Sequence, residues 1–392
     1  MNNPNQSPSR FRIPELDGLR GIAILLVLIH HYLAGHLGPE AGWIADWVTQ
    51  VFALSWSGVD LFFVLSGFLI GGILLEERES PNYFSSFFIR RASRILPLYF
   101  AWLILYWIIL WSHKLDIGSD QWLETFAPIY PHWAYAAFAQ NFFVAGREVF
   151  GPFWLGATWS LAVEVQFYLL VPFLVRFISE RKLPWVLGAI MVAVPLLRVM
   201  MYMCHPTVFV YTVLPCRVDT FVLGIFCAWL IRNAKFRQRL VAKQTDLQWL
   251  LLLLIFGLAL LSTKPFGSRT SFEMVLFGYT LLPMFYGCLL LIVLTADNGL
   301  IVGVVRNSLL QKLGVIAYGV FLMHLGIAGV AHAGLLYGNG IMHSPGDAWV
   351  TLLALAVTLA LASLSWRYFE KPIMNWSHRF IPKKTISPNE PS

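Results

Sequence analysis

The first apolar segment of the chain carries an arginine and a histidine at a helical spacing. The segment reads ELDGLRGIAILLVLIHHY, and Arg20 and His31 in it are eleven positions apart. An α-helix turns about 100° and rises about 1.5 Å per residue, so the two side chains lie within about 20° of one face and about 16 Å apart. His31 is thereby predicted deep in the bilayer, above an arginine at its rim. Because imidazole exchanges a proton near neutral pH, we interpret His31 as a buried general base, with a helix–helix hydrogen bond as the alternative.

Two further arginines are spaced to bind phosphate. They are Arg91 and Arg94 in FFIRRASRILPLYF, three positions apart and on one face if this segment is helical. A guanidinium keeps its charge and binds phosphate through two parallel N–H bonds, so the pair suits a ligand with several phosphates. The alternative is that these cations only anchor a cytoplasmic loop at the membrane surface.

Carboxylates inside apolar segments are the other candidates. Asp60, Glu164 and Asp219 lie within or beside such segments, where a charge costs about 2.5–3.5 kcal/mol on insertion scales. Glu164 is one helical turn from Tyr168 and is predicted to orient an imidazolium or to hold an acceptor hydroxyl. Arg217 and Asp219 are predicted at the outer mouth of a span, where they and Asp60 would bind sugar hydroxyls. Ion pairing between helices explains these charges equally well.

The four cysteines carry little functional information. They show neither a CxxC pair nor a metal-ligand spacing, so no metal site is predicted. Cys204 and Cys216 fall near one short outer loop and would pair in an oxidising compartment. Small apolar residues packed in helices are the simpler interpretation.

The candidate residues must be positioned by membrane helices. The chain has 392 residues, of which 58% are hydrophobic and 12% charged, whereas a soluble domain has about 25% charged residues. Apolar runs of roughly 20 residues, enough to cross a bilayer, recur along the whole sequence. The sequence therefore predicts an all-α, polytopic transmembrane helical bundle with about ten spans. Their predicted bounds are 16–36, 52–75, 94–112, 157–177, 184–203, 209–231, 248–263, 274–295, 313–336 and 349–369.

Basic residues set the predicted orientation. Of the 28 Lys and Arg, 22 fall on the side that holds both termini and six on the other, so both termini are predicted to be cytoplasmic. We expect a multi-pass protein of the cell inner membrane, with a cytoplasmic segment 1–15, a membrane domain 16–372 and a polar cytoplasmic tail 373–392. The aromatic outer loop 113–156 is predicted to be re-entrant or to cap a cavity. The net charge of +7 does not indicate nucleic-acid binding, because the cations lie in short loops.

Four motifs in combination resemble the membrane acyltransferase-3 family of integral-membrane O-acyltransferases, over about residues 10–372. One late motif includes Tyr318 and His324, a polar stripe to which the sequence itself assigns no role. Val165 departs from the family pattern, in which a second Glu often follows the first. The motif positions are Arg20 and His31; Arg91 and Arg94 with Pro97 and Tyr99; Trp159, Glu164, Phe167 and Tyr168; and Tyr318, Phe321, Leu322 and His324.

The resemblance implies an acyl-CoA donor, with acetyl as the expected group, and no bound cofactor. It assigns catalysis to His31, with Glu164 orienting it or the acceptor. The expected acyl-CoA site consists of Arg20, Arg91, Arg94 and Tyr99. The expected partners are membrane lipid, acyl-CoA and a carbohydrate or glycosylated acceptor. The alternative function is a proton-coupled transporter or flippase, because carboxylates and histidines inside a membrane also mark proton relays.

Overall fold

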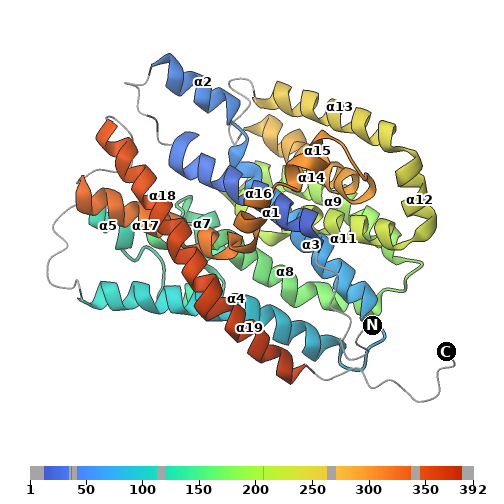
Figure 1. Ribbon diagram of the computed structural model, residues 1–392, viewed down its shortest axis with the longest axis horizontal. Coiled ribbons are helices and arrows are strands. Elements are labelled where there is room, and N and C mark those ends of the chain that lie inside the picture. Colours follow the sequence, from blue (N-terminus) through green and yellow to red (C-terminus); the bar gives the residue numbers. More distant parts are fainter. Residues whose placement is uncertain are drawn as a thin grey trace, which may run out of the picture.

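The computed structural model describes residues 13–34, 37, 42–112, 120–205, 207–262, 271–336 and 345–381. Nearly all of this part of the chain is helical, which confirms the all-α prediction (Figure 1). The predicted segment 1–15 and tail 373–392 lie mostly outside the described residues. The last helix, α19 (Lys371–Ser377), continues past the predicted boundary at 372.

Nine helical stretches in the described part of the chain are long and apolar enough to cross a bilayer. The protein is therefore a multi-pass membrane protein, as predicted, whereas the orientation of its termini stays a prediction. The stretches are Pro14–Ala34, Trp43–Glu76, Tyr83–Ser112, Phe153–Phe177, Leu183–Cys204, Gln244–Ser262, Met274–Thr295, Ala317–Leu335 and Gly346–Ser377.

The predicted span 209–231 is not one continuous helix. It is divided into α10 (Thr207–Thr212), a single 3-10 turn and α11 (Val218–Arg232). Pro215 lies in that turn, and proline has no N–H to continue a helical hydrogen-bond pattern. The 15 residues of α11 reach only about 22 Å, less than the roughly 30 Å hydrocarbon core. The break places Arg217 at the start of α11.

Helix α3 (Gly58–Glu76) packs closely against α11. A Cβ atom added to Gly67 would lie 2.0 Å from the carbonyl oxygen of Phe221, and one added to Gly224 would lie 2.2 Å from that of Val64. Only glycine permits this approach, and small residues are the usual means of bringing membrane helices together. The contact fixes the position of α3, which carries two of the polar residues considered below.

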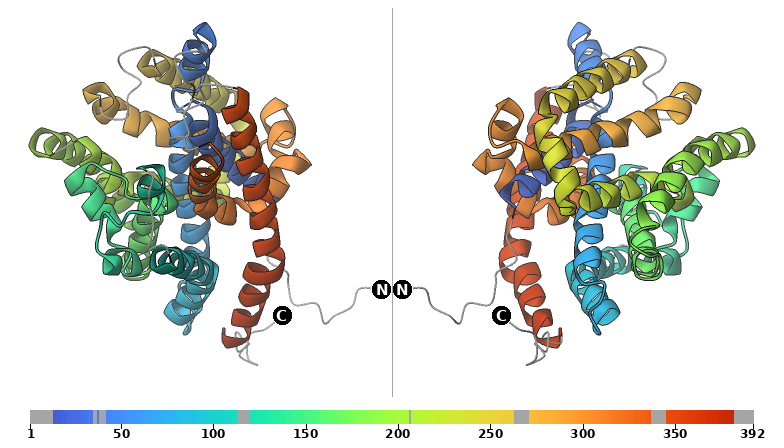
Figure 2. Two further views of the ribbon diagram at one scale, coloured as in Figure 1. Left: turned by 90° about the vertical axis from the view of Figure 1, so that its left-hand side faces the viewer. Right: turned by 90° about the vertical axis from the view of Figure 1, so that its right-hand side faces the viewer.

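Four other elements carry the remaining candidate residues. They are α1 (Pro14–Ile29) with a π-helical turn (His30–Ala34), α4 (Tyr83–Ser112), α8 (Thr158–Phe177) and α17 (Ala317–Leu335). Helices α1 and α3 run through the middle of the molecule, with α4 along one edge and α13 (Gln244–Ser262) along the other (Figure 1). Viewed from the sides, the central helices have green helices on one side and red helices on the opposite side (Figure 2). The candidate residues therefore come from the central helices α1 and α3 and from α4, α8 and α17, which pack around them.

Candidate active site

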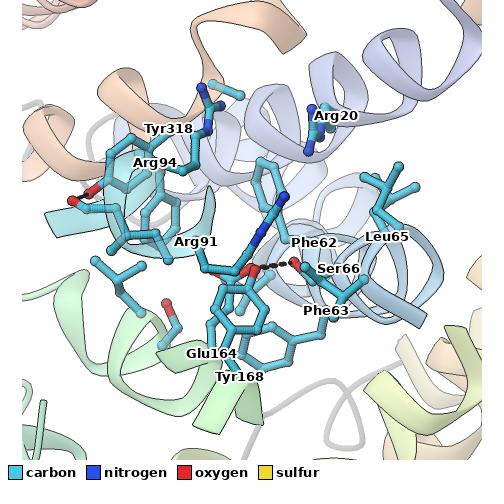
Figure 3. A pocket seen from close by; sticks show the side chains of 18 of the residues that line it. Arg20, Phe62, Phe63, Leu65, Ser66, Arg91, Arg94, Glu164, Tyr168 and Tyr318 are labelled. Atoms are coloured by element: carbon cyan, nitrogen blue, oxygen red, sulfur yellow. Dashed lines mark hydrogen bonds between the residues drawn. The ribbon is translucent and has the colours of Figure 1, made fainter. Parts of the chain in front are cut away.

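Three arginines converge on one cavity, here called the arginine cavity, of about 100 Å³ (Figure 3). Arg20 comes from α1, and Arg91 and Arg94 come from α4. Helix α4 is continuous through this region, so the condition for Arg91 and Arg94 to share a face is met. The other polar residues that line the cavity are Ser66, Ser160, Glu164, Tyr168 and Tyr318.

The three guanidinium groups differ in their partners. Arg94 lies 3.9 Å from the Glu370 carboxylate and over the rings of Tyr318 and Trp366. Arg20 lies 3.7 Å from Asp17. By contrast, Arg91 forms no hydrogen bond or ion pair with any residue that the structure describes. Its N–H donors are thus available for an anionic ligand within this part of the chain.

Glu164 also lies in the arginine cavity. Its carboxylate accepts hydrogen bonds from the Ser66 hydroxyl on α3 and from the Tyr168 hydroxyl on its own helix. The two hydroxyl groups are 3.2 Å apart, so the three side chains form one hydrogen-bonded group (Figure 3). Among the described residues, these hydroxyls and not His31 are the partners of Glu164.

His31 lies in a second cavity, the histidine cavity, of about 450 Å³. Aromatic rings make up much of its wall, and Phe150, Gly151, Phe153 and Gly156 of the predicted outer loop form part of it. That loop therefore borders a cavity, which is one of the two forms predicted for it. The lining residues are His30, His31, Trp56, Val59, Phe150, Gly151, Phe153, Gly156, Ala157, Trp159, Ser160, Tyr211, Phe321 and Leu325.

The backbone at His31 is not the straight α-helix that the spacing argument assumed. Residues His30–Ala34 form a π-helical turn, a feature that occurs frequently at functional sites. The His31 ring nitrogen Nδ1 lies 3.0 Å from the carbonyl oxygen of Val27 and 3.3 Å from Nε2 of His324. Arg20 and His31 thus serve two different cavities, although they belong to one continuous segment.

The two cavities share three lining residues, Val59, Ser160 and Phe321. They therefore adjoin, with a cationic chamber on one side of the shared wall and an imidazole with aromatic rings on the other. Such an arrangement suits a reaction between a phosphate-bearing donor and a second substrate, because each occupies its own chamber and the reacting groups meet at the wall.

The three residues predicted to bind an acceptor all form ion pairs within the protein. Arg217 donates to Asp60, and Arg198 donates to Asp219. The Arg217 and Arg198 guanidinium groups also lie 4.6 and 5.5 Å from the ring of Tyr279. Asp60, Arg217 and Arg198 are fully buried, and none of the four charged residues lines the arginine or the histidine cavity. The structure supports the ion-pair alternative for this cluster.

Comparison with known proteins gives the family. Residues 13–367 match the model of the acyltransferase-3 family, described as an acyltransferase domain. The chain belongs to the acyltransferase-3 family. The resemblance inferred from the four motifs is therefore confirmed over nearly the whole chain.

The relatives of this acyltransferase-3 chain include O-acetyltransferases by name. A Staphylococcus aureus (strain COL) protein named a putative O-acetyltransferase is 27% identical over 403 residues, covering 95% of this chain and 60% of that protein. The O-acetyltransferase OatA of Staphylococcus aureus (strain NCTC 8325 / PS 47) is 25% identical over 386 residues, covering 95% of this chain and 59% of OatA. The chain thus spans about 60% of the length of these curated relatives. No solved structure matches the chain significantly.

Tyr99 occupies a packing position in this acyltransferase-3 chain. Its hydroxyl donates to the carbonyl oxygen of Tyr135 at 2.8 Å, and its ring stacks on Phe138 at 4.4 Å. It is buried and lines neither the arginine nor the histidine cavity. These contacts join the outer loop to α4. They show no direct contact between Tyr99 and the arginine cavity, where acyl-CoA was expected to bind.

Two buried residues were not among the candidates predicted from the sequence. His324, left without a role, contacts His31. Arg198 lies inside the apolar stretch Leu183–Cys204 and is fully buried, where it pairs with Asp219. A cation in the middle of an apolar span was the signal that could have identified Arg198.

The described residues contain neither a candidate metal cluster nor a disulfide bond. No group of three or more His, Cys, Asp or Glu in the described ranges is arranged to hold a metal ion. All four cysteines are free, so Cys204 and Cys216 do not pair.

Proposed function

We propose that this protein is a membrane O-acetyltransferase that transfers an acetyl group from acyl-CoA to a hydroxyl of a sugar or glycan acceptor. The observation that carries the proposal is the pair of adjoining cavities, one holding three arginines and the other holding His31. The names of the relatives support O-acetyl transfer, and the family supports an acyltransferase.

The arginine cavity is the proposed donor site. Coenzyme A carries several phosphates, and guanidinium groups bind phosphate oxygens through charge-assisted hydrogen bonds. Arg91 is the best placed of the three, because Arg20 and Arg94 already face carboxylates of the chain. Lys and Arg are concentrated in the loops on one side of the protein. This distribution supports placing the arginine cavity at the cytoplasmic side of the cell inner membrane.

The histidine cavity is the proposed acceptor site. Trp56, Trp159 and Tyr211 present aromatic rings in it beside the imidazole. Binding sites for small molecules are usually concave and aromatic, with few polar groups that fix orientation. A sugar ring can lie against such a wall while one hydroxyl approaches His31.

The proposed reaction is a direct transfer across the shared wall. His31 removes the proton from the acceptor hydroxyl, the oxygen attacks the thioester carbonyl, and the carbon–sulfur bond breaks. The sulfur leaves as the thiolate of coenzyme A, and the proton on His31 then passes to it. A positioned base contributes roughly 10²–10⁴-fold to the rate, and the remaining acceleration is assigned to positioning of the two substrates.

Acyl-CoA turnover by purified protein in nanodiscs tests the proposal. We expect thioester consumption with the wild type, a loss of about 10²–10⁴-fold in His31→Ala, and a much smaller loss in His30→Ala. His30 is a matched control because it is the neighbouring residue and lines the same cavity. Comparing acetyl-CoA with longer acyl-CoA esters identifies the group transferred. If the protein neither binds nor consumes any acyl-CoA, the proposal fails.

A further inference from the structure

His31 and His324 contact each other although they are 293 positions apart in the sequence. The His31 ring lies in the π-helical turn after α1, and His324 lies on α17. Nε2 of His324 is 3.3 Å from Nδ1 of His31, and the ring centroids are 5.0 Å apart. His324 is fully buried and does not line the histidine cavity, so its ring contacts His31 without itself facing the cavity.

The neighbouring carbonyl groups determine where the protons lie. Nδ1 of His324 is 2.7 Å from the carbonyl oxygen of Phe321, and Nδ1 of His31 is 3.0 Å from that of Val27. A carbonyl oxygen can only accept, so Nδ1 carries the proton in both neutral rings. Nε2 of His324 then has a lone pair that shares the Nδ1–H of His31 with the Val27 carbonyl oxygen. Nε2 of His31 likewise has the lone pair that a general base needs.

We propose that His324 is a positioning residue that holds His31 as the Nδ1–H tautomer and stabilises the imidazolium formed when Nε2 takes the acceptor proton. The inference deepens the proposed function and rests on it. The role is that of the third member of a hydrolase triad, which orients a histidine without touching the substrate. Here a neutral imidazole takes the place of a carboxylate, and no metal or second charge is required.

The surroundings of His324 fix its position relative to His31. The Tyr32 hydroxyl donates to the backbone carbonyl oxygen of His324 at 2.8 Å and lies 3.2 Å from the Thr358 hydroxyl. Since Tyr32 follows His31 directly, the π-helical turn is joined to α17 once through the rings and once through this hydrogen bond. A general base has to be held within a narrow range of orientations, and these two links do so.

Two substitutions at 324 separate the two hydrogen bonds of the ring. In His324→Asn the amide can still donate to Phe321 but is too short to reach His31. In His324→Gln the longer side chain can place its amide oxygen near the position of Nε2 and accept from His31. The matched controls are His332→Asn and His332→Gln on the same helix, because His332 is also buried and contacts Thr351 at 3.0 Å, away from His31.

The first readout is steady-state acyl transfer by the full-length protein. For His324→Asn we expect kcat to fall roughly 10- to 100-fold, the loss expected for one hydrogen bond to a charged group, at unchanged KM for acyl-CoA. His324→Gln is expected to stay within about threefold of the wild type in kcat, and both His332 variants are expected to match it. Equal losses in the Asn and Gln variants, or an unchanged kcat in both, would overturn the proposal.

The second readout needs no substrate. Diethyl pyrocarbonate reacts with the unprotonated nitrogen of imidazole, and mass spectrometry of the peptide containing His31 gives the rate at that residue. We expect this rate to fall several-fold in His324→Asn and to be retained in His324→Gln, because an acceptor at Nδ1–H makes Nε2 more basic. A rate at His31 that is independent of residue 324 contradicts the proposal. If the variants show this pattern of reactivity at His31 but the wild-type protein transfers no acyl group, the result would instead refute the proposed function.

Discussion

Asp60 and Arg217 form an ion pair in which neither side chain is exposed. The pair joins α3 to the start of α11, at the point where the predicted sixth span is broken. A second pair, Arg198 with Asp219, lies beside it. These charges hold a broken helix against its neighbour inside the protein, where each buried charge alone would be strongly unfavourable.

Removal of one member of the buried pair should destabilise the fold. Arg217→Met leaves the Asp60 carboxylate buried without its cation, which is expected to cost about 3–5 kcal/mol. The double variant Asp60→Leu with Arg217→Met is expected to recover most of that loss, because apolar side chains replace a buried pair at little cost. Unfolding of the purified protein in detergent measures both.

The exposed pair Lys243–Asp246 provides the control for this experiment. Lys243→Met should change stability by less than about 1 kcal/mol. If Arg217→Met costs no more than this control, the pair is not structural. If the double variant is folded but no longer binds the acceptor, the result would support the predicted acceptor-binding role of Asp60 and Arg217.

The sequence could show that these charges need partners but not which partners they have. Hydropathy places Asp60, Arg217 and Asp219 in or beside apolar spans, and the cost of burial then requires pairing. The contact between Asp60 and Arg217 crosses 157 positions, and neither helical periodicity nor local spacing carries information over that distance. The break at Pro215 was likewise hidden, because the apolar residues continue through it.

Arg91 should contribute mainly to binding of the donor. It lines the arginine cavity and has no ion-pair partner in the described part of the chain, so a phosphate group can use its whole guanidinium fork. Arg91→Ala is expected to raise KM for acyl-CoA about 10- to 100-fold with little change in kcat. Initial rates over a range of acyl-CoA concentrations give both constants.

Arg90 is the matched control for Arg91. It is the preceding residue on α4, but its guanidinium donates to Glu77 and it does not line the arginine cavity. Arg90→Ala should leave KM for acyl-CoA within about threefold of the wild type. Similar increases in KM for the two variants would mean that general positive charge, and not the cavity, attracts the donor.

Phe321 should limit the length of the acyl group. It lies in the wall shared by the two cavities and packs edge-to-face on Phe62 at 6.1 Å. Phe321→Ala opens this wall, so butyryl-CoA should gain relative to acetyl-CoA in kcat/KM by about tenfold or more, the size of the discrimination that one or two methylene groups allow. Phe62→Ala is the control, because Phe62 lines only the arginine cavity of the two. An unchanged acyl-length profile in Phe321→Ala would show that the group does not cross there.

The sequence singled out several residues that line the two cavities, but it did not show how these residues are arranged relative to one another. The face shared by Arg91 and Arg94 follows from an uninterrupted helix, and α4 provides one. The π-helical turn at His31 adds a residue to one turn, which no hydrophobic pattern reveals. Glu164 was expected beside His31 or the acceptor, whereas its hydroxyl partners are in the arginine cavity. That position depends on how α8 packs on α3, which is a tertiary property.

The aromatic wall of the histidine cavity should determine affinity for the acceptor and not for the donor. Trp159 lines this cavity and packs against Tyr211 with ring centroids 4.7 Å apart. Trp159→Leu removes one aromatic contact, worth about 0.5–1.5 kcal/mol, so KM for the acceptor should rise roughly 2- to 12-fold while KM for acyl-CoA stays constant. Trp102→Leu is the control, because Trp102 stacks on Trp154 at 4.0 Å and lines neither cavity. Titration of each substrate at a fixed concentration of the other separates the two constants. An increase in KM for acyl-CoA alone in Trp159→Leu would reverse the assignment of the two cavities.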